Sequence, residues 1–69
     1  MNELIFAVEE AAEGGYTAKA LGVSIFTEAE SLDELRENVV DAVRCHFGDE
    51  RERPGKGRLH FVRDEELPL

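Results

Sequence analysis

Apolar residues recur at steps of three and four between Ser31 and Phe47, which is the spacing of one face of an α-helix. The opposite face carries mostly charged residues, as on the solvent face of an amphipathic helix: Asp33, Glu34, Glu37, Asp41 and Arg44. Ser31 can accept from a backbone N–H of the first turn and Glu34 can reach back to Ser31, which together form a capping box. Gly48 then acts as a stop signal. The pattern predicts a helix over residues 31–47. Its apolar face comprises Leu32, Leu35, Val39, Ala42, Val43 and Phe47.

The first apolar run, over residues 4–9, has the composition of a β-strand with two apolar faces. One face carries Leu4, Phe6 and Val8, and the other carries Ile5 and Ala7. A strand that is apolar on both faces is usually central in its sheet and covered twice. One helix covers one face only, so we expect the second cover to come from another chain or from the C-terminal segment.

Two more strands are predicted before the helix, over residues 16–21 and 23–29. The paired glycines Gly14 and Gly15 supply the positive φ angles that a hairpin turn needs, and Gly22 marks the second turn. Strands joined by turns this short form an antiparallel meander.

After the helix, residues 48–57 have the composition of a loop, residues 59–63 form a last short strand, and residues 64–69 form an acidic tail. A connection that runs through a helix suits a parallel neighbour. The predicted fold is α+β in the order β-β-β-α-β. It comprises an antiparallel three-strand meander, one helix on one face, and the last strand parallel beside the first. We interpret residues 1–69 as a single domain without a separate DNA-binding region.

The chain carries 16 acidic and 8 basic residues, for a net charge of −8 over 69 residues. Phosphate contacts need a basic face, so this charge argues against direct binding of nucleic acid and permits a basic protein partner. A chain of this size buries only about 60% of its unfolded surface. We therefore expect a homo-oligomer, either a dimer or a tetramer.

The single cysteine allows no internal disulfide and fits a reducing compartment, so we expect a cytoplasmic protein. The N-terminal residues lack the pattern of a signal peptide, and no apolar stretch is long enough for a membrane span. Charged residues make up 35% of the chain and glutamine is absent, which is typical of thermophilic proteins.

Three glutamates, Glu9, Glu10 and Glu13, gather around the first turn beside Tyr16. We predict that these four residues contact an Arg- or Lys-rich partner, with a solvated turn as the simpler alternative. Nucleases of the RNase H type hold metal with several carboxylates, one of them in the middle of the first strand. Residues 6–8 occupy that position here and are apolar. We therefore expect no enzymatic activity, no metal and no cofactor.

An oligomer would use the sheet face that the helix leaves open, or an edge strand. The residues predicted for this interface are Ile5, Ala7, Phe26 and Phe61.

Cys45, His46 and His60 are the remaining side chains with nucleophile or metal-ligand chemistry. Neighbouring residues on a helix point about 100° apart, so Cys45 and His46 do not face one point. His46 near a helix C-terminus suits the helix dipole, and Cys45 is typical of a small buried residue. We predict no catalytic role for these three residues.

Two short motifs resemble the HicB antitoxin family. The family pattern has an acidic turn that ends in Gly-Gly-Tyr, and later a Thr-x-Gly-(Asp/Glu)-(Ser/Thr)-Leu-x-Glu-Ala entry to the helix. The matching residues are Gly14, Gly15 and Tyr16 in the turn, and Thr27, Glu30, Ser31, Leu32 and Glu34 in the helix entry. Ala29 stands where the family usually has Gly, and Leu35 where it usually has Ala. The resemblance extends over roughly residues 4–63.

This resemblance implies a partial RNase H-like fold and an antitoxin that covers and neutralises a small basic ribonuclease of the HicA type. Many HicB proteins also carry a C-terminal DNA-binding region, and no such role is expected for this chain. The second hypothesis is a stand-alone oligomeric domain of the same fold, without a toxin, that binds a small ligand or another protein.

Overall fold

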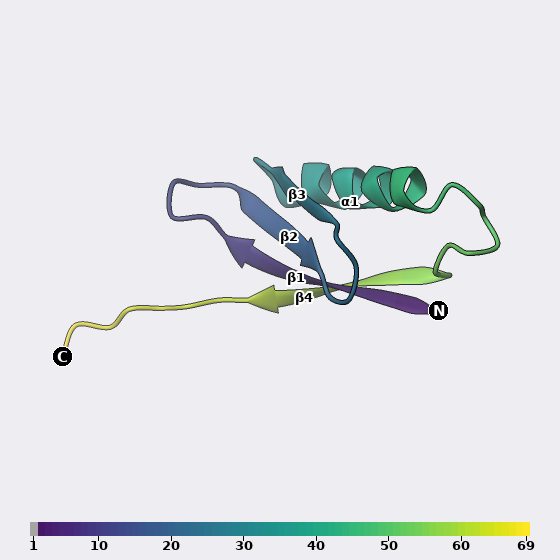
Figure 1. Cartoon of the computed structure of the whole chain (residues 1–69). Helices are drawn as coiled ribbons and strands as arrows, with labels where there is room; N and C mark the ends of the chain where they lie inside the picture. Colours follow the sequence, from purple (N-terminus) through teal and green to yellow (C-terminus); the bar gives the residue numbers. More distant parts are fainter. Residues whose placement is uncertain (1) are drawn as a thin grey trace.

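The computed structural model describes residues 2–69 and shows one four-stranded sheet with one helix against it (Figure 1). The elements in chain order are β1 (Glu3–Glu10), β2 (Tyr16–Ala20), β3 (Phe26–Ala29), α1 (Leu32–His46) and β4 (Lys56–Val62). The strand order in the sheet is β3-β2-β1-β4. β1 pairs antiparallel with β2 and parallel with β4. The predicted α+β fold, with β1 inside the sheet and the last strand parallel to it, is confirmed.

The turn between β1 and β2 depends on its two glycines. Gly14 and Gly15 have φ angles of 99° and 83°, in the region that side chains disfavour. Two backbone hydrogen bonds of 3.0 Å close the turn, from Gly14 to Ala11 and from Ala11 to Gly15. A Cβ atom on Gly15 would lie 2.8 Å from the carbonyl oxygen of Ala29, at the end of β3. The turn therefore packs directly against the entry to the helix.

The hydrophobic core lies between α1 and the sheet. The helix contributes Leu35 and Val39, which meet alternate residues of β1 and β2. Ala18 and Ala20 on β2 are fully covered, and their small side chains let the helix approach the sheet closely. The buried residues are Leu4, Phe6, Val8, Ala18, Ala20, Ile25, Leu35 and Val39.

The helix begins and ends where its capping residues predict, within one residue. The Ser31 side chain accepts a hydrogen bond from the Glu34 backbone N–H at 3.2 Å, which is the first half of the predicted capping box. Phe47 is the C-cap, and its N–H donates to the Val43 carbonyl. Gly48 is not among the glycines with positive φ in residues 2–69, so the helix ends without the expected left-handed glycine.

Two strands, β3 and β4, differ from their predicted bounds by more than one residue. β3 begins at Phe26 and not at residue 23. Ile25 is buried, and its N–H donates to the Val23 carbonyl at 3.0 Å, so residues 23–25 form a turn. Only the Ile25 carbonyl reaches β2, where it accepts from the Ala20 N–H at 2.9 Å. β4 begins at Lys56, three residues earlier than predicted, and ends before Arg63. Its polar start becomes a strand because it pairs along β1 from Glu3 onward.

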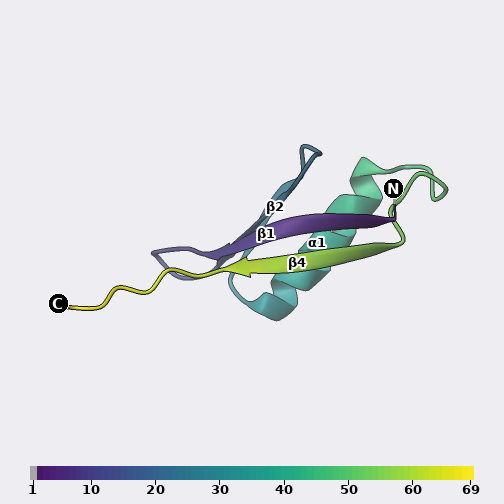
Figure 2. The ribbon, with the colours of Figure 1, turned by 90° about the horizontal axis from the view of Figure 1, so that it is seen from below.

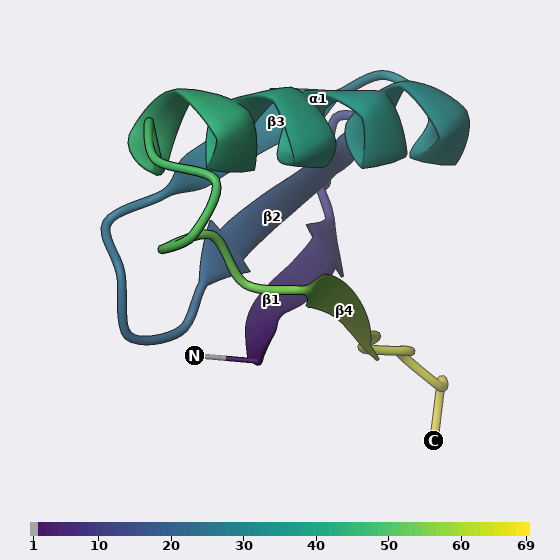
Figure 3. The same cartoon turned by 90° about the vertical axis from the view of Figure 1, so that its right-hand side faces the viewer.

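The helix does not cover the sheet evenly. It packs mainly on β3 and β2, whereas the main contacts of β4 are with β1. Figure 3 shows α1 above β3 and β2, with β1 and β4 progressively farther from the helix. As a result, Phe61 lies on the helix side of the sheet and is still 52% exposed.

The C-terminal segment leaves the sheet and gives it no cover. Residues 63–69 are all exposed and contain no helix or strand. Figure 2, seen from the face opposite α1, shows this segment continuing past the end of β4, beyond the sheet. The second cover that the two apolar faces of β1 require therefore does not come from this segment. Among residues 2–69, no helix is long and apolar enough to cross a lipid bilayer.

Candidate functional site

The face of the sheet opposite α1, here called the open face, is built from alternate residues of all four strands. Strand pairing sets its rows, because residues opposite each other project to the same side. One row joins His60, Ala7, Lys19 and Phe26 across the sheet. The next row, toward the β1–β2 turn, joins Val62, Glu9, Thr17 and Glu28. The open face therefore mixes apolar and charged side chains in a pattern fixed by register.

The apolar part of the open face is accessible. Phe26 is 62% exposed, and Leu21, just after β2, is 54% exposed. Ile5 and Ala7 on β1 are half-buried, in contrast to their neighbours on the covered face. Val62 at the end of β4 adds a further exposed apolar side chain. An apolar area rimmed by charges on an uncovered sheet is a typical protein-binding surface.

The structure separates the residues predicted for an oligomer interface. Ile5, Ala7 and Phe26 lie together on the open face. Phe61 pairs with Val8, so it projects to the helix side, opposite to the other three. One flat contact cannot use all four residues, and Phe61 belongs to a different surface.

The glutamates predicted to bind a partner stand at one end of the sheet. Glu9 and Glu10 end β1 and are exposed, and Glu13 is exposed in the turn that follows. Glu9 projects to the open face, whereas Glu10 pairs with Tyr16 on the other side. Tyr16 is half-buried and packs against the core, so it supports the turn more than it offers a contact surface.

Three more glutamates join this end, and the sequence alone did not select them. Glu28, Glu30 and Glu34 line a hollow of about 290 Å³ beside the β1–β2 turn. The hollow exists because Gly15 packs on Ala29 and brings the turn to the helix entry. The sequence does contain a signal for these glutamates, because all three lie within the segment that holds the helix-entry motif. We call the six residues the acidic end: Glu9, Glu10, Glu13, Glu28, Glu30 and Glu34.

At the opposite end of the sheet, an acidic side chain is paired with basic ones. Glu3 on β1 pairs with Arg58 at 2.9 Å and with Lys56 at 3.6 Å, both on β4. Within residues 2–69, none of the glutamates of the acidic end takes part in an ion pair. The two ends of one sheet therefore present different electrostatic fields, and the field of the acidic end is negative.

The side chains that could bind a metal or act as nucleophiles lie on different elements of the fold. Throughout residues 2–69, no three His, Cys, Asp or Glu side chains gather closely enough to hold a metal ion. His60 stands on the open face of β4, while Cys45 and His46 end α1. Cys45 is exposed, so its predicted burial is wrong. It follows Val43 by two residues, which turns it about 200° away from the face that meets the sheet.

One carboxyl group has a clearly shifted pKa, in the loop between α1 and β4. Asp49 accepts a hydrogen bond from the Arg51 backbone N–H at 2.9 Å, and a second from the Arg51 side chain. These bonds, the backbone one first, lower the pKa of Asp49 below its usual 3.8. We assign this Asp49–Arg51 contact a structural role in the loop.

The fold and these surfaces define a small α+β domain with an uncovered sheet face and an acidic end. The chain is 65% identical over 51 residues to a UPF0150 protein of Archaeoglobus fulgidus, a match that covers 74% of each chain. It is 39% identical over 62 residues to a UPF0150 protein of Thermotoga maritima, covering 90% of this chain and 86% of the relative. The chain belongs to the UPF0150 family.

Both relatives come from thermophiles, in keeping with the thermophilic bias of this composition. No protein-family model matches the chain. No solved structure matches it either.

Proposed function

We infer that this protein is a non-enzymatic interaction domain of the HicB antitoxin type, which binds and neutralises a small basic ribonuclease of the HicA type. The observation that carries the proposal is the acidic end, whose carboxylates have no ion-pair partner among residues 2–69 and adjoin an uncovered apolar sheet face. Opposite charges steer association, and the apolar area supplies contact once the partners meet.

The contact between the two HicB-like motifs supports the same proposal. Gly15 in the Gly-Gly-Tyr turn packs on Ala29 in the helix entry, so the residues that carry the resemblance form one local structure. Glu28, Glu30 and Glu34 project from this structure. A chain that keeps both motifs therefore also keeps a rigid platform for its acidic side chains.

The proposal places this binding in the cytoplasm, where a ribonuclease toxin meets RNA. A lone thiol at Cys45, exposed and without a disulfide partner, is compatible with that reducing compartment.

Co-expression with the product of the neighbouring reading frame tests the proposal, provided that frame encodes a short basic chain. The wild-type protein is expected to co-purify with that chain, to suppress its growth arrest and to inhibit its RNA cleavage. The double variant Glu9→Lys/Glu10→Lys should weaken binding by about tenfold or more at low salt, because it replaces attraction by repulsion.

The matched control is Glu37→Lys/Asp41→Lys, which makes the same change of charge on the exposed face of α1. It should bind like wild type, and the difference between the two double variants should shrink as salt screens the exposed charges. No complex and no rescue of growth by the wild-type chain would refute the antitoxin role.

A second candidate function is a stand-alone oligomeric domain of the same fold, without a toxin. The exposed Leu21 and Phe26 favour it, because an apolar sheet face is also a suitable contact between copies. A pull-down from cell extract that returns only the protein itself would favour this alternative.

A further inference from the structure

A groove runs along the helix side of the sheet, between α1 and β4. It exists because α1 packs on β3 and β2 and leaves β4 uncovered. Two adjoining hollows of about 230 and 330 Å³ form it, and both are lined by Val39 and Val40 of α1 and by Gly57 of β4. Its floor is apolar, since Leu59 joins the valines and Val40 is 47% exposed. We call it the α1–β4 groove.

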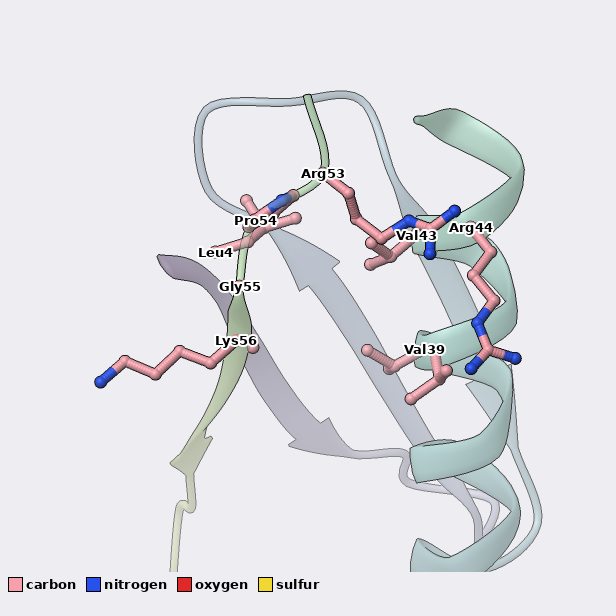
Figure 4. A pocket seen from close by; sticks show the side chains of 10 residues that line it. Leu4, Val39, Val43, Arg44, Arg53, Pro54, Gly55 and Lys56 are labelled. Atoms are coloured by element: carbon pink, nitrogen blue, oxygen red, sulfur yellow. The ribbon is translucent and has the colours of Figure 1, made fainter. Parts of the chain in front are cut away.

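Basic side chains stand at the rim of this groove in a chain of net charge −8. Arg44 comes from α1 and Arg53 from the loop before β4. Figure 4 shows Arg53 reaching from the loop toward α1, while Lys56 points away from the pocket. The Nε atom of Arg53 is buried and has no hydrogen-bond partner among residues 2–69. Neither Arg44 nor Arg53 forms an ion pair within residues 2–69, so both guanidinium charges are open to pairing with an incoming carboxylate.

The outer edge of β4 is also unoccupied within the described chain. β4 is the last strand of the sheet order and spans seven residues, against four for β3 at the other edge. It contains no proline that would block pairing. Such an edge is a template for another strand, and pairing with its own copy about a two-fold axis is necessarily antiparallel.

The acidic tail, residues 64–69, has the chemistry that this groove would accept. Asp64, Glu65 and Glu66 precede Leu67, which is 69% exposed. The groove opens beside the start of β4, whereas the tail leaves from its end, about 20 Å away along the strand. Figure 1 shows the tail running on in the direction of β4, away from the start of that strand.

We propose that two copies of this chain pair antiparallel through β4, and that the tail of each copy docks in the α1–β4 groove of the other. Antiparallel pairing places the end of one β4 beside the start of the other, where the groove opens. The tail carboxylates then meet Arg44 and Arg53, and Leu67 contacts the apolar floor. This contact uses an edge and a groove, and does not use the open face.

A charge-swap experiment tests the proposal in solution. Variant T carries Asp64→Lys, Glu65→Lys and Glu66→Lys; variant G carries Arg44→Glu and Arg53→Glu. Sedimentation of wild type over a micromolar concentration series is expected to show a dimer. T alone and G alone should each raise the dimer dissociation constant by about tenfold or more, because like charges then meet.

An equimolar mixture of T and G should restore dimers, as heterodimers in which both tail–groove contacts are complementary. This result separates exchange between copies from docking within one chain, since a tail docked in its own groove gains nothing from mixing. Lys19→Glu reverses a basic charge on the open face, away from the groove; it is the control for charge reversal and should leave the dimer unchanged. Circular dichroism checks that each variant folds.

The proposal is overturned if wild type is a monomer throughout the series, if T and G dimerise like wild type, or if mixing T and G restores nothing. The antitoxin role is tested separately: if monomeric T still binds the basic partner, the antitoxin role stands whether or not the dimer proposal does.

Discussion

The two faces of the sheet come from the same strands and differ in what lies over them. On the covered face, Phe6 of β1 and Leu35 of α1 are both fully buried in one hydrophobic core. On the open face, Ile5 and Ala7 of the same strand are only half-buried, and Phe26 is largely exposed. An apolar strand face is thus either core or contact surface, and the position of one helix decides which.

The largest expected effect breaks the covered face. Phe6→Ala should lower the free energy of unfolding by about 3–5 kcal/mol, because it leaves a cavity under α1. Phe26→Ala, the same change on the open face, should stay within about 0.5 kcal/mol. Urea denaturation at low protein concentration measures both free energies of unfolding. If Phe6→Ala does not fold, Phe6→Leu replaces it, with an expected loss of less than about 1.5 kcal/mol. Equal losses at Phe6 and Phe26 would contradict the division of the faces.

The next largest effect tests the β1–β2 turn, which packs against the helix entry at the acidic end. Gly14→Ala should cost about 1 kcal/mol for its positive φ, since open space surrounds it. Gly15→Ala adds a clash with the Ala29 carbonyl, which should cost roughly 1–3 kcal/mol more. The difference in urea midpoint between the two variants isolates the clash. If the variants are equally stable, the turn does not pack on the helix entry.

A smaller effect tests how the helix is placed over the sheet. Ser31→Ala removes the acceptor for the Glu34 N–H and should cost about 1 kcal/mol. Ser24→Ala, in the exposed segment before β3, is the control and should change little. Thermal unfolding followed by circular dichroism compares them, and a silent Ser31→Ala would show that packing alone positions α1.

The smallest effect lies in the loop that carries the chain from the covered face to β4. The folded pKa of Asp49 is below its usual 3.8, so its contribution to stability is present above that value and is lost as the pH falls through the folded pKa. Wild type should therefore lose its small advantage over Asp49→Asn below about pH 3.8. Urea midpoints across pH 2–6 measure this, and a pH-independent difference would refute it.

The sequence predicted the covered face well, because local signals and long-range packing agree there. The period of α1, the cap at Ser31 and the paired glycines each act within a few residues. The errors fall where a distant partner decides. Ile25 has strand-like chemistry and is buried in a turn, while polar Lys56 enters a strand because it lies along β1.

The candidate surfaces were predicted only in part, for a similar reason. Alternation within a strand places Phe61 opposite His60, but only the register with β1 assigns Phe61 to the helix side. The three glutamates around Glu30 join the acidic end through a contact between segments that are well separated along the chain. The α1–β4 groove follows from the offset of the helix, which no local pattern encodes.

The parallel pairing of β1 with β4 also has a consequence for folding during synthesis. β1 leaves the ribosome before β2, β3 and α1, whereas β4, its neighbour on one side, leaves after them. One edge of an apolar strand therefore stays open while the hairpin, β3 and the helix form, and pairing across almost the whole chain is slow. In this interval the nascent protein is most exposed to aggregation or to capture by a chaperone.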